Sequence, residues 1–304
     1  MLGKSLPFVV FILITFSSCK KDQVIYEDNT IPPYEEIPTV VVQNYINRLY
    51  IDLIGREPID TEMEAETVFL ESENLNSDAR LDLVTRLQFD TSPSVGDSSY
   101  NYAYFFKLYE DCKARMVEGI SEGGLMQEYG LYNGNAILDS LNGNWPSYNY
   151  NRTEADKLLA VMNSREELMN SEITIDEMCR RLLFNSIYDQ INMNSFNFVN
   201  ASFDDLFFRF PTDSEFESAY NVIEFNQAAF IFGQIVQNKV EYLQVLTTNQ
   251  EFDEGMVRWA YAQLLAREPN SLEVFELAAD FSTSKNFQAI QQTILITDEY
   301  AGFD

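Results

Sequence analysis

The side chains that could do chemistry in this chain are mainly carboxylates. The 304 residues include 48 Asp and Glu but no His, which removes Ser-His-Asp and Cys-His nucleophile systems and the commonest metal and haem ligand. Two acids with different pKa values can hydrolyse a glycosidic bond, but no motif selects a pair among so many. The sequence also contains no CxxC pair, no phosphate-binding Gly-rich loop and no EF-hand spacing. We therefore assign no catalytic residue, no metal site and no cofactor, and we do not expect an enzyme.

Cys19 has a context that points to covalent modification. It follows Lys4, an apolar run from Leu6 to Phe16 and two serines, and this run is too short for a permanent membrane span. The segment resembles a lipoprotein signal peptide, although Phe16 stands where such signals usually have Leu. The resemblance implies that residues 1–18 are removed and that Cys19 is acylated. The following CKKD resembles lipoproteins of the Bacteroidetes, which implies a lipid-anchored protein of the outer membrane or cell surface.

Two other cysteines, Cys112 and Cys179, lie far apart in the sequence. An exported pair could form a disulfide, but nothing in the sequence fixes its geometry. We expect two separate buried thiols.

An aromatic segment, residues 127–152, is the candidate binding region. It lies in a stretch rich in Gly and Asn (121–151), which we predict to be a long loop. Exposed aromatic rings could stack on a carbohydrate or anchor a partner protein; alternatively, the rings fold back onto neighbouring helices. The candidate binding residues are Tyr129, Tyr132, Trp145, Tyr148 and Tyr150.

The composition indicates a folded and acidic protein. The net charge is −28, which disfavours nucleic acid as a partner because such binding depends on neutralising phosphates. Hydrophobic residues make up 46% and aromatic residues 14%, too much for a disordered chain. Residues 19–38 carry prolines and charges without periodicity and read as a flexible tether.

From Thr39 onward the apolar spacing is helical. We predict helices at about 39–54, 61–73, 77–89, 98–120, 152–170, 174–188, 196–208, 213–231, 238–247, 253–266, 271–282 and 286–297, and we see no long alternating β-strand pattern.

A short string recurs three times among these helices. YINRLYIDLIGREPIDTEM begins at residue 45, FVNASFDDLFFRFPTDSEF at residue 198 and MVRWAYAQLLAREPNSLEV at residue 256. An aromatic residue, Leu, Arg, Pro and Glu match in all three copies, without gaps. The matched positions are Tyr50, Leu53, Arg56, Pro58 and Glu62; Phe203, Leu206, Arg209, Pro211 and Glu215; and Tyr261, Leu264, Arg267, Pro269 and Glu273.

Backbone geometry explains this pattern as a helical corner. Gly55 can end the first helix in the left-handed conformation, Pro cannot continue that helix, and Glu has the capping-box position of the next one. We expect the Arg to reach either the last carbonyls of the first helix or the Glu of the second. Ile59 cannot cap with its side chain, so Asp60 or Thr61 is expected to cap. Copy two has Phe208 in place of Gly55 and Phe210 in place of Glu57, so we expect its corner to be built differently or packed more deeply.

The corner resembles the L-Y-x-x-L-L-G-R-E-P-x-x-x-E motif of two bacterial modules. One is the uncharacterised domain that accompanies cytochrome c domains in planctomycete-type surface proteins. The other is the phycobilisome-linker-like repeat domain of exported bacterial proteins, whose ending is similar to ILITDEYAGF at residues 294–303. The resemblance implies helical architecture and transfers no catalytic residue.

Together these patterns predict an all-α, multi-helical fold with three degenerate helix-corner-helix repeats and an inserted helical segment. We expect a signal peptide (1–18), a tether (19–38), the first repeat with the insertion and aromatic loop (39–195), and the second and third repeats (196–304). The expected function is non-enzymatic: binding or scaffolding in an outer-membrane or cell-surface assembly with a protein partner. The alternatives are a carbohydrate-binding accessory lipoprotein and a partner of a cytochrome or redox system.

Overall fold

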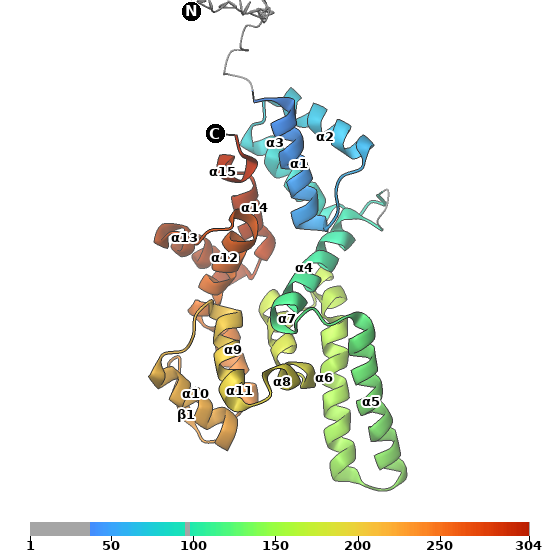
Figure 1. Ribbon diagram of the computed structural model, residues 1–304, viewed down its shortest axis with the longest axis vertical. Coiled ribbons are helices and arrows are strands. Elements are labelled where there is room, and N and C mark those ends of the chain that lie inside the picture. Colours follow the sequence, from blue (N-terminus) through green and yellow to red (C-terminus); the bar gives the residue numbers. More distant parts are fainter. Residues whose placement is uncertain (1–36, 95–97, 304) are drawn as a thin grey trace, which may run out of the picture. The chain divides into compact units, whose positions relative to one another are not determined.

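Helices form nearly all the regular structure in residues 37–94 and 98–303, the part of the chain that the computed structural model describes (Figure 1). The all-α prediction is confirmed. The expected signal peptide, Cys19 and the tether up to residue 36 lie outside these residues. Within the described ranges, no helix combines the length and the apolar character needed to cross a bilayer.

The helices are α1 (Thr39–Ile54), α2 (Asp60–Ser72), α3 (Ser77–Phe89), α4 (Tyr100–Met116), α5 (Glu122–Leu141), α6 (Trp145–Met169), α7 (Ile175–Leu183), α8 (Ser186–Asn192), α9 (Ser195–Phe207), α10 (Asp213–Phe225), α11 (Lys239–Thr248), α12 (Gln250–Leu265), α13 (Ser271–Ser284), α14 (Phe287–Leu295) and α15 (Asp298–Ala301). The strands β1 (Ala229–Ile231) and β2 (Gln234–Val236) pair antiparallel, with Phe230 opposite Ile235.

The predicted loop at 121–151 is wrong. Its residues form α5, a tight turn and the start of α6, and these two helices pack along each other as a hairpin (Figure 1). Ser121 caps α5 by accepting a hydrogen bond from the Gly124 amide at 3.1 Å, and Gly143 makes the turn at φ 71°. Packing against α6 therefore overrides the low helix propensity of Gly and Asn.

Two other predicted helices have wrong boundaries. The window 174–188 is divided into α7 and α8, because Asn185 caps a new helix by accepting hydrogen bonds from two backbone amides. The window 213–231 overran α10, which ends at Phe225, and covered β1. The sequence AFIFGQIV alternates only briefly around a Gly turn, so helical spacing upstream masked a hairpin.

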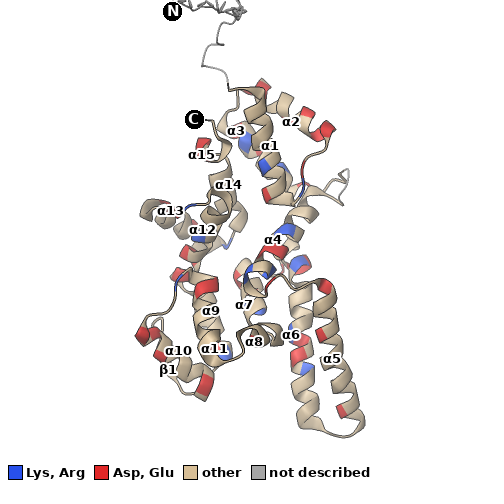
Figure 2. Ribbon diagram, in the orientation of Figure 1, with Lys and Arg blue, Asp and Glu red and all other residues tan. Residues whose placement is uncertain are grey.

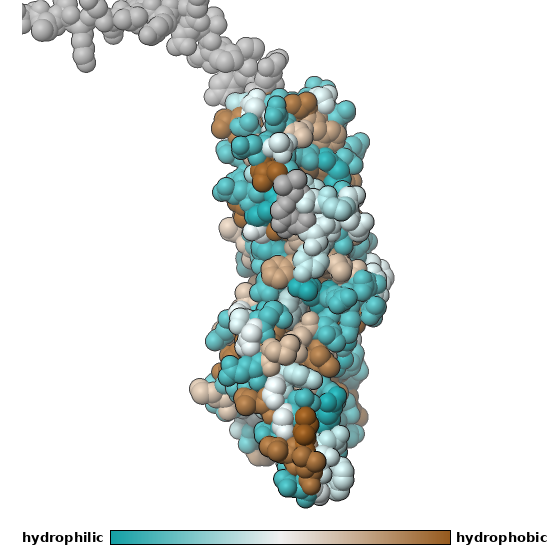
Figure 3. Space-filling model, turned by 90° about the vertical axis from the view of Figure 1, so that its right-hand side faces the viewer, coloured by the Kyte–Doolittle hydropathy of each residue, from teal (hydrophilic) through white to brown (hydrophobic). Residues whose placement is uncertain are grey.

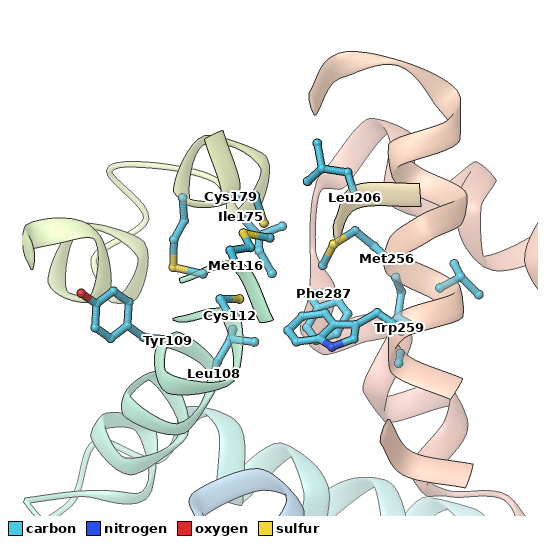
Figure 4. Packing of buried hydrophobic residues seen from close by; sticks show 14 of the residues in the cluster. Leu108, Tyr109, Cys112, Met116, Ile175, Cys179, Leu206, Met256, Trp259 and Phe287 are labelled. Carbon is cyan, nitrogen blue, oxygen red and sulfur yellow. The ribbon is translucent and has the colours of Figure 1, made fainter. Parts of the chain in front are cut away.

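The core joins elements that are distant in sequence. In Figure 4, α4 and α7 contribute Leu108, Met116 and Ile175, and α12 and α14 contribute Trp259 and Phe287. The last two rings stack with centroids 5.1 Å apart. The first and third repeats meet where α3 packs on α14 and α1 on α15, and α9 of the second repeat packs on α12.

The two described cysteines are fully buried and free, as predicted, but they are not separate. Cys112 on α4 and Cys179 on α7 lie in the same core cluster (Figure 4). A hydrogen bond with Cys179, followed by burial, raises the pKa of the Cys112 thiol. The 3.6-residue repeat of each helix places both on core faces, but only the α4–α7 packing brings them together.

Candidate functional site

The three corners share one hydrogen-bonding arrangement. The Arg guanidinium donates two bonds to the Glu six residues later: 2.7 and 2.8 Å for Arg56, 2.9 and 2.7 Å for Arg209, and 3.0 and 2.8 Å for Arg267. Of the two expected partners, the Glu of the second helix is therefore correct. Each Arg also lies 4.8–5.5 Å from the ring centroid of the matched aromatic residue, a cation–π distance.

The first helix of every corner ends in a left-handed residue. Gly55 has φ 75°, Phe208 60° and Ala266 51°. Of the two expectations for the second corner, a different build is wrong, because Phe208 keeps the left-handed conformation, whereas its ring is half-buried against the core where Gly55 is exposed. The strained backbone of Phe208 is held because the Arg115 guanidinium lies 3.6 Å from its ring centroid and donates to the Asp204 and Asp205 carbonyls at 2.6 and 2.7 Å. The contacts with Arg115 thus stabilise in Phe208 the left-handed conformation that Gly55 adopts without strain in the first corner.

The start of the second helix also repeats. Each Glu accepts a bond from the backbone amide of the N-cap residue, at 2.9 Å from Ile59, 2.7 Å from Thr212 and 2.6 Å from Asn270. Ile59 itself occupies the N-cap, so the expectation that Asp60 or Thr61 would cap α2 is wrong. Glu62 makes its half of the capping box, and the side-chain half is absent from this described corner because Ile has no acceptor.

Two further acids complete the second and third corners. Glu251, in the first turn of α12, accepts bonds from Arg209 at 2.8 and 2.7 Å. Glu299, in the first turn of α15, accepts bonds from Arg267 at 2.6 and 2.8 Å. Each is followed by a buried aromatic residue, Phe252 or Tyr300. The sequence argument missed these acids, although the shared Glu-aromatic pair was a usable signal.

The repeat is therefore longer than the corner. A second unit runs through α9, α10, α11 and α12, and a third through α12, α13, α14 and α15, so that α12 belongs to both. The corner side chains are engaged with one another, and this arrangement stabilises backbone turns. The hydrogen-bonding groups of these corner side chains are therefore occupied within the fold.

A groove of about 800 Å³ lies between α12 and α13. Lys285 pairs there with the buried carboxylate of Asp253, and the ring of Phe275 is exposed at its side. Burial raises the pKa of Asp253, and the Lys285 ion pair opposes that shift. The two charges of this pair therefore satisfy each other.

The α5–α6 hairpin holds all five aromatic residues of the candidate binding region. Trp145 and Tyr150 are 57% and 60% exposed, whereas Tyr129, Tyr132 and Tyr148 are half-buried. The Tyr132 and Tyr150 rings meet edge to face between the helices at 6.3 Å, and those of Trp145 and Tyr148 meet at 5.7 Å. Each of the two exposed rings is thus also paired with a half-buried ring of the hairpin.

The outward face of α5 is the most unusual surface of the hairpin. Among the described elements, α5 packs extensively against α6 alone, while α6 also packs on α4 and α7. A solvent-facing helix surface is normally polar, yet five large apolar side chains of α5 are more than half exposed. They are Met126, Leu131, Ile137, Leu138 and Leu141. In Figure 3 brown surface gathers at the lower end of the molecule, where the hairpin turns.

This surface is also nearly free of charge. Between Glu128 and Arg152 the sequence has a single charged residue, Asp139, although 22% of the whole chain is charged. Figure 2 shows the corresponding part of the hairpin almost entirely tan. Asp139 accepts hydrogen bonds from Ser147 at 2.7 Å and Asn151 at 2.8 Å, both on α6. The Asp139 carboxylate is therefore hydrogen-bonded within the hairpin.

Comparison with known proteins adds no neighbour to this description. No family model matches the chain, and neither a curated protein nor a solved structure gives a significant match. The family expectations drawn from the corner motif and from the Cys19 segment stay predictions.

Proposed function

We propose that this protein is a non-enzymatic, membrane-anchored lipoprotein that acts as a scaffold by binding another protein on the outward face of α5. The observation that carries the proposal is the row of exposed apolar side chains on a helix whose other side packs on α6. An apolar patch of this kind on a folded protein marks an interaction site. Trp145 extends it beyond the end of α5.

The anchor rests on the sequence of residues 1–19, which lie outside the described structure. Acylation of Cys19 and a polar tether would hold the helical unit at the outer membrane or cell surface. A high negative charge keeps such a protein from associating non-specifically with its acidic neighbours. Against that background a neutral face is where a partner can approach without repulsion.

Carbohydrate binding is the second candidate, supported by the exposure of Trp145 and Tyr150. Sugar platforms present aromatic faces together, whereas three of the five rings here are half-buried and two pairs meet edge to face. The aliphatic residues on the same face have no role in such a platform. The arrangement therefore favours a protein partner, and no contact of the described residues favours a redox partner.

Site-specific photo-crosslinking in intact cells tests the proposal. A photoreactive residue at Leu138 should give a discrete adduct with another polypeptide in the membrane fraction. The same residue at Val68 of α2, which is exposed to a similar degree (62% against 58%), is the matched control and should give none. Cys19→Ala should move both the protein and its adduct into the soluble fraction. Equal labelling at the two positions would refute docking on α5, and membrane retention of Cys19→Ala would refute the anchor.

A further inference from the structure

The outward face of α5 has the spacing of a helix–helix seam. Gly123, Gln127, Gly130, Gly134, Ile137 and Leu141 follow one another at alternating intervals of four and three residues. This interval keeps side chains on one line when two helices wrap around each other. Met126, Leu131 and Leu138 flank the line and are 56–58% exposed. A seam of this type that points to solvent is incomplete without a second helix.

Two glycines on this seam, Gly130 and Gly134, are required by neither the packing nor the backbone of the described chain. A Cβ added at Gly130 or Gly134 would meet nothing within 4 Å, and neither residue has a positive φ. Glycine inside a helix weakens it relative to alanine. Two such residues on an exposed face leave a shallow notch where another helix backbone can approach closely, as small residues do at close helix contacts.

We propose that the occupant of this notch is α5 of a second copy of this chain, packed antiparallel about a two-fold axis. The proposal rests on the docking function above and names its partner. With the axis between Gly130 and Gly134, the two notches face each other. Leu141 of one copy then lies on Gly123 of the other, and Ile137 lies on Gln127. Leu141 therefore meets a glycine at each end of the seam, Ile137 meets the side chain of Gln127, and the two glycines face each other at the centre, so that the same surface is used by both copies, as a two-fold interface requires.

Charge limits the face on which a second copy can dock. Two chains that each carry −28 repel through most of their surfaces, and the stretch between Glu128 and Arg152 has only Asp139, whose carboxylate is bonded to α6. The six large apolar side chains at the face, Trp145 included, would bury roughly 600 Å² per copy, close to the ~800 Å² typical of a stable interface.

The test is sedimentation velocity on the chain from Lys20 to Asp304, which contains every described residue. We expect a concentration-dependent dimer. Gly130→Leu and Gly134→Leu fill open space in the monomer, so each should keep or raise the melting temperature of the monomer. Each should also raise the dimer dissociation constant at least ~10-fold by filling the notch. Ala262→Leu, at an exposed position of α12, adds a comparable side chain elsewhere and should leave the constant unchanged.

A chain that stays monomeric up to ~100 μM, or a dimer that both glycine variants leave intact, would overturn the proposal. The crosslinking experiment separates this failure from that of the proposed function. An adduct at Leu138 containing only this chain supports both. An adduct with a different polypeptide, together with a monomer in solution, leaves docking in place and refutes the second copy.

Discussion

At the scale of the residue, the three corner arginines repeat one set of contacts. Each has its guanidinium against an aromatic ring and makes two bonds to a Glu that also holds an N-cap amide. The matched columns of the sequence predicted which residues act together, because fixed spacing fixes their places on two consecutive helices. They did not predict Glu251 or Glu299, because these acids arrive from a later helix after segments of different length.

Arg209→Ala should lower the free energy of unfolding by about 1.5–3 kcal/mol at pH 7, because it removes charge-assisted bonds to two acids. The bonds with Arg209 lower the pKa of Glu215 to about 2. The contribution of Glu215 is therefore complete above its unfolded pKa of about 4.3 and is lost as the pH falls toward 2. Thermal melts from pH 7 to 3 should show the deficit of the variant shrinking with acidity.

Arg258→Ala is the matched control, since it removes the same charge from one intrahelical pair at 3.4 Å. It should cost only about 0.3–0.5 kcal/mol. Equal losses in the two variants would show that net charge, and not the corner, sets the effect.

At the scale of the element, the sequence predicted helices whose apolar face is buried. It did not predict α5, whose large apolar side chains are exposed. Helices α1 and α3 were placed correctly because their buried residues recur at three and four positions. Over α5 the Gly and Asn content predicts a loop, and no apolar periodicity counters it, because only Leu125 and Ala136 of this helix are buried. The seam positions of α5 do follow three-and-four spacing in the sequence. Because three of the six are Gly, they do not form the apolar pattern that predicts a helix.

One contact between elements depends on a single glycine. A Cβ at Gly255 of α12 would lie 1.9 Å from the carbonyl oxygen of Leu206 on α9. That oxygen belongs to the backbone and cannot move aside without shifting a helix. Gly255→Ala should therefore cost about 1–3 kcal/mol or more through overpacking, as measured by chemical denaturation. Gly134→Ala, in open space, should instead stabilise by up to about 1 kcal/mol; stabilisation by both would contradict the close approach of α9 and α12.

At the scale of the molecule, the first and third repeats are joined through the last short helix. The Tyr300 hydroxyl donates to Asp52 at 2.7 Å, and its carbonyl accepts from Arg48 at 2.6 Å. Arg48 also donates to the carbonyl of Leu264 at 3.1 Å, near the third corner. The sequence predicted three repeats but could not predict this joining, because residues about 250 positions apart carry no local periodicity.

Tyr300→Ala should cost about 3–5 kcal/mol, because a fully buried ring is lost from the contact between the two repeats. Tyr300→Phe keeps the ring and removes only the bond to Asp52, so it should cost about 1 kcal/mol. The two free energies of unfolding can be compared in urea. Similar losses would mean that the ring does not support the contact.

The sharing of α12 by two repeats restricts where another domain can be inserted into this chain. Because α12 ends one repeat and begins the next, a whole unit cannot be added or removed between these two repeats. A circular permutation or a fused domain placed between α11 and α13 would break two repeats at once. Between α4 and α9 no helix is shared by two repeats, and there the chain already carries the α5–α6 hairpin. The turn at residues 142–144 lies outside the shared helix, so a domain inserted there should leave the repeats folded, but because it lies between Leu141 and Trp145 it should block docking on α5.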